Sequence, residues 1–107
     1  SRQAMDIRGL GEKIIEKLDK AISINSNAES YNRAGIVLMQ ANHQSEALVY
    51  WQKAMELDPD NINLLKNMMQ YHLGFSKNID KAKEYAQRIR ELGGKINPQI
   101  QSFLNEN

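Results

Sequence analysis

Apolar and small residues recur at three- and four-residue steps along almost the whole chain, the spacing of helices that bury one face. No segment shows the strict alternation of a half-buried strand. Two prolines and six glycines in 107 residues leave room for long uninterrupted helices. The periodicity therefore predicts an all-α chain.

The composition excludes several classes of protein. With 41% hydrophobic and 25% charged residues, the 107-residue chain is typical of one soluble globular domain. The lack of cysteine excludes disulfides, thiolate zinc sites and thiol nucleophiles. No apolar run approaches the roughly 20 residues of a membrane span, and a net charge of +1 argues against nucleic-acid binding through bulk charge. The compartment stays open, with the cytoplasm as the default.

Capping residues predict where the helices begin and end. Asn27 or Ser26 can cap a helix over 28–40, and a turn over 42–45 leads to a second helix that ends at Asp58. Pro59 is expected to open a third helix, which runs from about 61 to 73. A fourth helix is expected over 79–92, with Gly93 and Gly94 in its C-terminal turn, and a short last helix begins at Asn97-Pro98.

The ends of these helices repeat along the chain. Ala54 and Leu57 close one helix, and Ile89 and Leu92 close another in the same way about 35 residues later. Ala21 and Ile24 stand in the same relation about 33 residues earlier. A period near 34 with two helices per unit indicates a solenoid, whose units bury their faces on each other.

The unit over 28–61 closely resembles a tetratricopeptide repeat. Small Gly35 and Ala47 stand where two helices cross closely, and large Tyr31, Leu38 and Trp51 stand where gaps must be filled. The matching positions of the family pattern are Tyr31, Ala34, Gly35, Leu38, Ala47, Trp51, Ala54, Leu57 and Pro59.

The flanking units fit the family pattern less well. Residues 62–95 are a degenerate repeat, with Met69 where a small residue is usual and one extra residue in the turn. Residues 1–27 align as a partial repeat with Gly9 at its turn. The alternative is a single long helix over 2–24, in which Gly9 and Gly11 each cost about 1 kcal/mol.

The resemblance implies a right-handed α–α superhelix of about two and a half hairpins, with a C-terminal capping helix over 96–107. Because the array starts partway through a repeat, we expect the C-terminal part of a longer protein. Its N-terminal edge should leave Ile14, Ile15 and Leu18 partly uncovered.

The chain lacks the residue patterns of catalysis or metal binding. His43 and His72 stand 29 residues apart with no ligand spacing around them, and Gly9-Leu10-Gly11 lacks the rest of a phosphate loop. We therefore expect no enzyme activity, catalytic residue, metal or cofactor.

The resemblance implies a binding surface on the first helix of each hairpin, facing a concave groove that holds a partner's peptide. Asn and Gln side chains suit peptide amides, and Arg33 and Lys66 can pair with carboxylates. However, Asn32 and Ile36 stand where the family's two-carboxylate clamp has lysine and asparagine. The implied groove residues are Glu29, Asn32, Arg33, Ile36, Asn63, Lys66, Asn67 and Gln70.

Two alternatives to this surface stay open. The uncovered N-terminal edge can pack against a second copy of the chain, with no peptide ligand. Charge is also uneven: residues 62–107 hold seven basic and four acidic side chains, and residues 28–61 hold two and five. These charges are either solvated outer faces or, in the C-terminal part, a basic face for acidic peptide, lipid headgroup or RNA.

Overall fold

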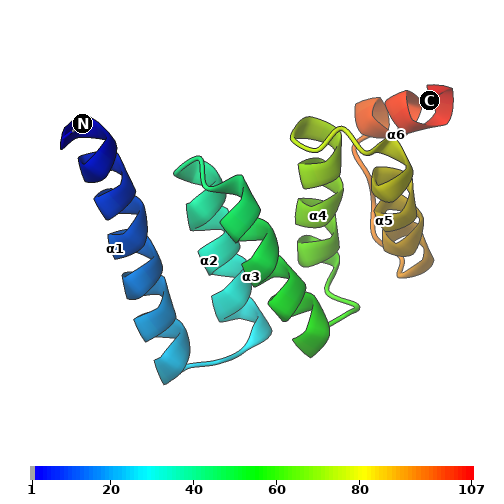
Figure 1. Cartoon of the computed structure of the whole chain (residues 1–107). Helices are drawn as coiled ribbons and strands as arrows, with labels where there is room; N and C mark the ends of the chain where they lie inside the picture. The colour runs from blue at the N-terminus through cyan, green and yellow to red at the C-terminus, as the bar shows by residue number, and fades with distance from the viewer. Residues whose placement is uncertain (1) are drawn as a thin grey trace. The chain divides into compact units, whose positions relative to one another are not determined.

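Six α-helices and no strand make up residues 2–107 in the computed structural model, which confirms the all-α prediction (Figure 1). The structure describes the backbone from Arg2 onward and the side chains from Glu12 onward. The helices are α1 (Arg2–Ile24), α2 (Ala28–Gln40), α3 (Gln44–Leu57), α4 (Ile62–Gly74), α5 (Ile79–Glu91) and α6 (Pro98–Glu106).

Asparagine caps begin four of these helices. In each case the side-chain oxygen of the cap accepts a hydrogen bond from a backbone N–H in the first turn, at 2.8–3.2 Å, which satisfies a donor that has no partner inside the helix. The caps are Asn27 for α2, Asn61 for α4, Asn78 for α5 and Asn97 for α6.

The two prolines behave differently. Pro98 is the first residue of α6, as predicted. Pro59 lies in the turn before Asn61 and does not open α4, so that expectation is wrong. The reason is local, because the Asn61 side chain accepts from the backbone N–H of Leu64 and thereby makes Ile62 the first helical residue. Gly93 ends α5 with a φ of +85°, the left-handed conformation that glycine adopts at little cost.

Helix α1 runs without interruption from Arg2 to Ile24. The turn expected at Gly9 is therefore not formed, and the alternative of one long helix is the correct one. A cost of about 1 kcal/mol per glycine is small enough for the packing of the rest of the helix to offset.

The chain divides into two compact units, residues 1–58 and residues 59–107. In the first unit, α2 and α3 form a hairpin, and α1 packs against its core through half-buried apolar side chains. Leu57, which closes α3 in the repeating sequence pattern, lies outside this core, because its side chain is 56% exposed. The buried core residues of this cluster are Ile22, Ala34, Leu38, Ala47 and Tyr50, and the half-buried residues around it are Ile14, Ile15, Leu18, Tyr31 and Met39.

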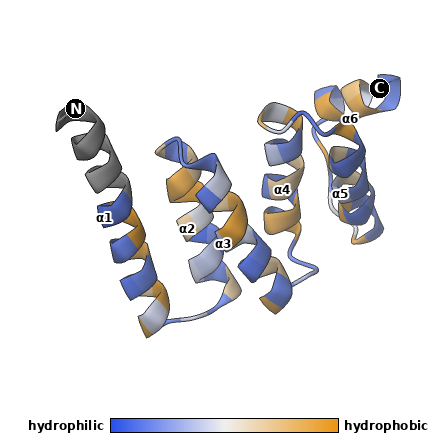
Figure 2. Cartoon of the chain, viewed as in Figure 1, coloured by the Kyte–Doolittle hydropathy of each residue, from blue (hydrophilic) through white to orange (hydrophobic). Residues whose placement is uncertain are grey.

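The second unit is the hairpin of α4 and α5 with α6 packed on α5. Leu104 is the buried residue of α6, whereas its neighbour Phe103 is 45% exposed. Helix α5 carries apolar residues on one side and polar residues on the rest of its surface (Figure 2). The buried residues of α4 and α5 are Leu64, Leu65, Met68, Met69, Tyr71, Ala82, Ala86 and Ile89.

Candidate functional site

Contact between Gly35 and Trp51 sets how closely α2 and α3 pack. A Cβ atom at Gly35 would lie 2.2 Å from Nε1 of the Trp51 indole, so only glycine fits here. The indole N–H donates to the carbonyl oxygen of Asn32 at 3.2 Å. The contact between Gly35 and Trp51 holds one face of α2 against α3. The other face of α2 points toward solvent.

The four groove residues predicted on α2 lie on that other face, because their spacing of three and four residues follows the helical repeat. Glu29 and Arg33 form an ion pair at 2.6 Å, with 70% and 75% of their side chains exposed. Ile36 is exposed, and Asn32 is half-buried. The face therefore offers a charged pair next to an apolar side chain.

The four predicted residues on α4 share one face in the same way. Asn63 and Gln70 are exposed, whereas Lys66 and Asn67 are half-buried. The structure thus brings each set of four together on its own helix, α2 in the first unit and α4 in the second.

The two histidines have separate surroundings. His43 precedes α3, with Nδ1 4.0 Å from a carboxylate oxygen of Glu46. His72 stacks on the Tyr85 ring at a centroid distance of 5.7 Å, and its Nδ1 lies 2.8 Å from Oγ of Ser76.

Burial lowers the pKa of His72, and the positive charge of Lys81 adds to the effect while Glu84 opposes it. Within the part of the chain whose side chains are described, no group of three or more His, Asp or Glu side chains is arranged so that it could hold a metal ion.

A contact that the sequence analysis missed joins α1 to α3. The Tyr50 hydroxyl donates to the Asp19 carboxylate, and Lys53 lies 5.9 Å from the ring centroids of both Tyr31 and Tyr50. Burial, followed by the hydrogen bond and charge of Asp19, raises the pKa of Tyr50 to about 12. No local pattern links Asp19 to Tyr50 across 31 residues, so only the packing of α1 shows the pair.

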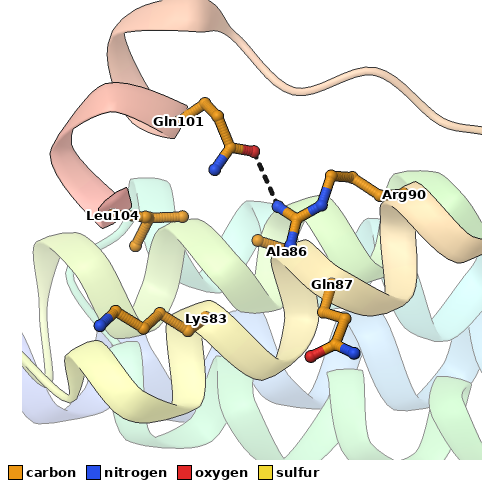
Figure 3. A pocket seen from close by; sticks show the side chains of 6 residues that line it. All are labelled: Lys83, Ala86, Gln87, Arg90, Gln101 and Leu104. Atoms are coloured by element: carbon orange, nitrogen blue, oxygen red, sulfur yellow. Dashed lines mark hydrogen bonds between the residues drawn. The ribbon is translucent and has the colours of Figure 1, made fainter. Parts of the chain in front are cut away.

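A second missed feature is a cleft between α5 and α6 (Figure 3). The sequence signal that could have indicated it is the spacing of Lys83, Gln87 and Arg90, which places all three on one face of a helix. The lining residues are Lys83, Ala86, Gln87, Arg90, Gln101 and Leu104.

Comparison with known proteins agrees with this geometry for the α2–α3 hairpin. The tetratricopeptide repeat family model matches residues 28–61, the unit that contains Gly35 and Trp51. No curated protein and no solved structure matches the chain. Within residues 2–107, we find no helix with the length and hydropathy needed to cross a membrane. The hairpin of α2 and α3, with the turn that follows it, is thus the part of the chain that matches the tetratricopeptide repeat family.

Proposed function

We propose that this chain is a non-catalytic interaction module that binds a peptide or a partner subunit through the exposed faces of α2 and α4. Tetratricopeptide repeats are generally protein-interaction modules on a non-catalytic scaffold. The observation that carries the proposal is the family match over 28–61, where α2 buries Ala34, Gly35 and Leu38 and leaves its opposite face exposed. The proposal also treats residues 62–95 as a diverged second repeat and residues 96–107 as its cap.

The chemistry of these faces supports an extended peptide. Asn and Gln side chains both donate and accept hydrogen bonds, which suits backbone amides. Arg33 can exchange Glu29 for a carboxylate of the partner, because their exposed pair contributes little to stability. Ile36 offers an apolar contact beside it. Asn32 and Ile36 are not the lysine and asparagine of a two-carboxylate clamp, so that mode of capture is not proposed.

Selection of peptides from a displayed random library, followed by affinity measurement, tests the proposal. We expect Arg33→Glu and Lys66→Glu each to weaken binding of the selected peptides by about tenfold or more, because each reverses a charge on a proposed face. Gln52→Glu on α3 is the matched control, since Gln52 is also exposed on a helix but lies outside both faces. Unchanged affinity in both variants, with unchanged helical circular dichroism, would reject these faces.

A second candidate function is self-association through α1. Ile14, Ile15 and Leu18 are only half-buried, and Ile24 at the end of α1 is 87% exposed. Such apolar surface can pack against a second copy. Sedimentation over a range of concentrations tests this, and we expect Leu18→Glu to abolish any increase in mass. A monomer at the highest concentration removes the candidate.

A further inference from the structure

The connection between α1 and α2 holds an asparagine followed by a serine, outside any helix (Figure 1). Asn25 follows the last residue of α1, Ser26 precedes the cap Asn27, and all three residues are exposed. An asparagine is chemically labile when the next backbone nitrogen can attack its side-chain amide carbon, because the two close a five-membered ring. Whether a given asparagine reacts therefore depends on how the N–H after it is engaged.

The backbone nitrogen of Ser26 is available for this attack. Among the residues that the structure describes, its N–H donates to no backbone carbonyl. The Ser26 hydroxyl donates to the carbonyl oxygen of Ile22 at 2.7 Å, so it is not engaged with the Asn25 amide. Serine also has no branched apolar side chain to hinder the approach of its nitrogen, in contrast to valine or isoleucine.

The side chain of Asn27 activates the Asn25 amide. Its Nδ2 donates to Oδ1 of Asn25 at 3.0 Å. Attack on Cγ of Asn25 places negative charge on this oxygen, and a donor that is already in place stabilises the charge. The donor is itself held, because Oδ1 of Asn27 accepts from the backbone N–H of Ser30 at 2.8 Å as the cap of α2.

Two other asparagines outside the helices lack an available nitrogen. The residue after Asn42 is His43, whose N–H donates to the carbonyl oxygen of Leu38 at 2.7 Å. The residue after Asn97 is Pro98, which has no N–H. Neither asparagine can therefore close the ring as the structure stands.

The remaining asparagines are protected by caps or by helical backbone. The Asn27 side chain is held by its cap bond, and the nitrogen that would attack it belongs to Ala28, the first residue of α2. Asn61 and Asn78 are held by equivalent cap bonds, and a β-branched isoleucine follows each. Helical backbone keeps the next nitrogen away from the side-chain amide carbon of Asn32, Asn63, Asn67 and Asn105.

We propose that Asn25 is a site of spontaneous covalent modification, at which attack by the Ser26 nitrogen and hydrolysis by water convert the asparagine to aspartate and isoaspartate. The Ser26 nitrogen loses its proton to hydroxide or a buffer base and bonds to Cγ of Asn25. The bond between Cγ and Nδ2 of Asn25 then breaks, and ammonia leaves with a proton taken from water. A second water opens the ring at either carbonyl. The proposal uses no residue of the α2 and α4 faces and does not depend on the proposed function.

The modification changes the connection that carries α1. The backbone N–H of Asn27 donates to the main-chain carbonyl oxygen of Asn25 at 3.1 Å. In the isoaspartate product this oxygen belongs to a carboxylate, and the main chain runs through the former side chain and is longer. The new charge also lies beside the C-terminal end of α1, where the helix dipole is negative. We therefore expect the isoaspartate form to hold α1 less firmly.

Ageing the whole folded chain at mildly alkaline pH, followed by tryptic digestion in weak acid and fragmentation mass spectrometry, tests the site. Trypsin releases residues 21–33, which hold Asn25, Asn27 and Asn32 in one peptide. Because the cap protects Asn27, we expect Asn25 to react about fivefold faster or more. In the free synthetic peptide the two should react at comparable rates. Equal rates in the folded chain, or no reaction at Asn25 when the free peptide has reacted, would overturn the proposal.

Variants of the residue after each asparagine test the attacking nitrogen. Ser26→Gly should speed the reaction at Asn25 and Ser26→Ile should slow it severalfold, because a β-branched side chain hinders the nitrogen. Ala28→Gly is the matched control, since it makes the same change after the capped Asn27 and should leave Asn27 slow. Circular dichroism checks that each variant is folded. An unchanged rate at Asn25 in folded Ser26→Ile would reject attack by this nitrogen.

The role of Asn27 is tested by Asn27→Asp. Aspartate keeps a side-chain oxygen for the cap of α2 and removes the N–H donor to Asn25. We expect the reaction at Asn25 to slow severalfold, and Asn25→Gln to abolish it, because the longer side chain does not close the five-membered ring. An undiminished rate in Asn27→Asp would contradict the activation by Asn27.

Hydrogen exchange of the isoaspartate form, separated by ion exchange, tests the consequence for α1. The amides of α1 should exchange faster than in the unmodified chain, whereas those of α5 should exchange as before. Equal exchange of α1 in the two forms would contradict the expected loosening.

Discussion

The α2–α3 and α4–α5 hairpins place buried residues of opposite size at the same helix positions. Gly35 and Trp51 are the eighth residues of α2 and α3, and Met69 and Ala86 are the eighth residues of α4 and α5. All four positions are buried. The large side chain comes from the second helix in one hairpin and from the first helix in the other. The comparison teaches that the large buried side chain at this position can come from either helix of a hairpin.

A tyrosine at the seventh position of the second helix also differs between the hairpins. Tyr50 of α3 donates its hydroxyl to Asp19 of α1, whereas Tyr85 of α5 stacks on His72 of α4. The same residue type therefore joins a hairpin to a preceding helix in one unit and joins the two helices of a hairpin in the other.

Replacing Trp51 by a small residue and Gly35 by a large one tests whether the first hairpin accepts its large buried side chain from the other helix. These changes should have the largest effect on stability. Trp51→Ala should lower the free energy of unfolding by about 3–5 kcal/mol, and Gly35→Met by at least about 3 kcal/mol through overlap with the indole. The double variant should be more stable than the sum of these losses by about 1–3 kcal/mol. Urea unfolding followed by circular dichroism measures all three, with trimethylamine N-oxide added where a variant is unfolded in buffer. If the loss of stability in the double variant equals the sum of the two single losses, the first hairpin does not accept a large side chain from the other helix.

A smaller change at the contact between Gly35 and Trp51 tests how closely the two helices must pack. Gly35→Ala should cost about 1–3 kcal/mol, because its Cβ would overlap the Trp51 ring. Gly74→Ala at the end of α4 is the matched control, since a Cβ there meets no atom within 4 Å. Thermal unfolding should show a loss for Gly35→Ala and no loss for Gly74→Ala. Equal effects would mean that the indole moves aside at no cost.

Removing the Tyr50 hydroxyl tests the connection between α1 and the first hairpin. Tyr50→Phe should lower the free energy of unfolding by about 0.5–1.5 kcal/mol, the contribution of one hydrogen bond. Because the pKa of Tyr50 is raised from 10.0 to about 12 in the folded state, this stabilisation is complete below pH 10 and is lost as pH rises toward 12.

The stability of wild type and Tyr50→Phe from pH 8 to pH 12 measures this difference. The two proteins should differ most below pH 10 and converge above it. A constant difference across the range would contradict the assignment.

Acid should weaken the second unit, with the smallest of these effects. The folded-state pKa of His72 is lowered, so the unfolded chain binds the proton first and the stabilisation present above pH 6.5 declines as pH falls below it. Wild type should therefore lose stability between pH 7.5 and pH 5, and His72→Gln should lose less. His43→Gln is the control and should behave as wild type. If the stability of His72→Gln falls with pH as steeply as that of the wild type, the titrating group is not His72.

Much of the fold follows from local sequence. The bounds of α2 and the caps Gly93 and Asn97 were predictable, because each depends on hydrogen bonds and backbone conformations within a few residues. For the cap of α2 the sequence left Asn27 and Ser26 open, and the structure shows Asn27. The exposed faces of α2 and α4 were predictable for the same reason, since helical spacing alone brings four residues to one face. The start of α4 was not, because Pro59 and Asn61 both suit a helix beginning and only the formed cap distinguishes them.

The sequence by itself determined the all-α class, the bounds of α2 and the hairpin at residues 28–61 that matches the tetratricopeptide repeat family, because these depend on spacing within a helix or between two neighbouring helices. Tertiary structure alone decided that α1 continues through Gly9, that Tyr50 meets Asp19, and that α6 orders Arg90 through Gln101. These outcomes depend on which surfaces remain to be buried once the helices have formed. Which side chains far apart in the chain come into contact depends on how the helices pack, and the periodicity within one helix does not determine it.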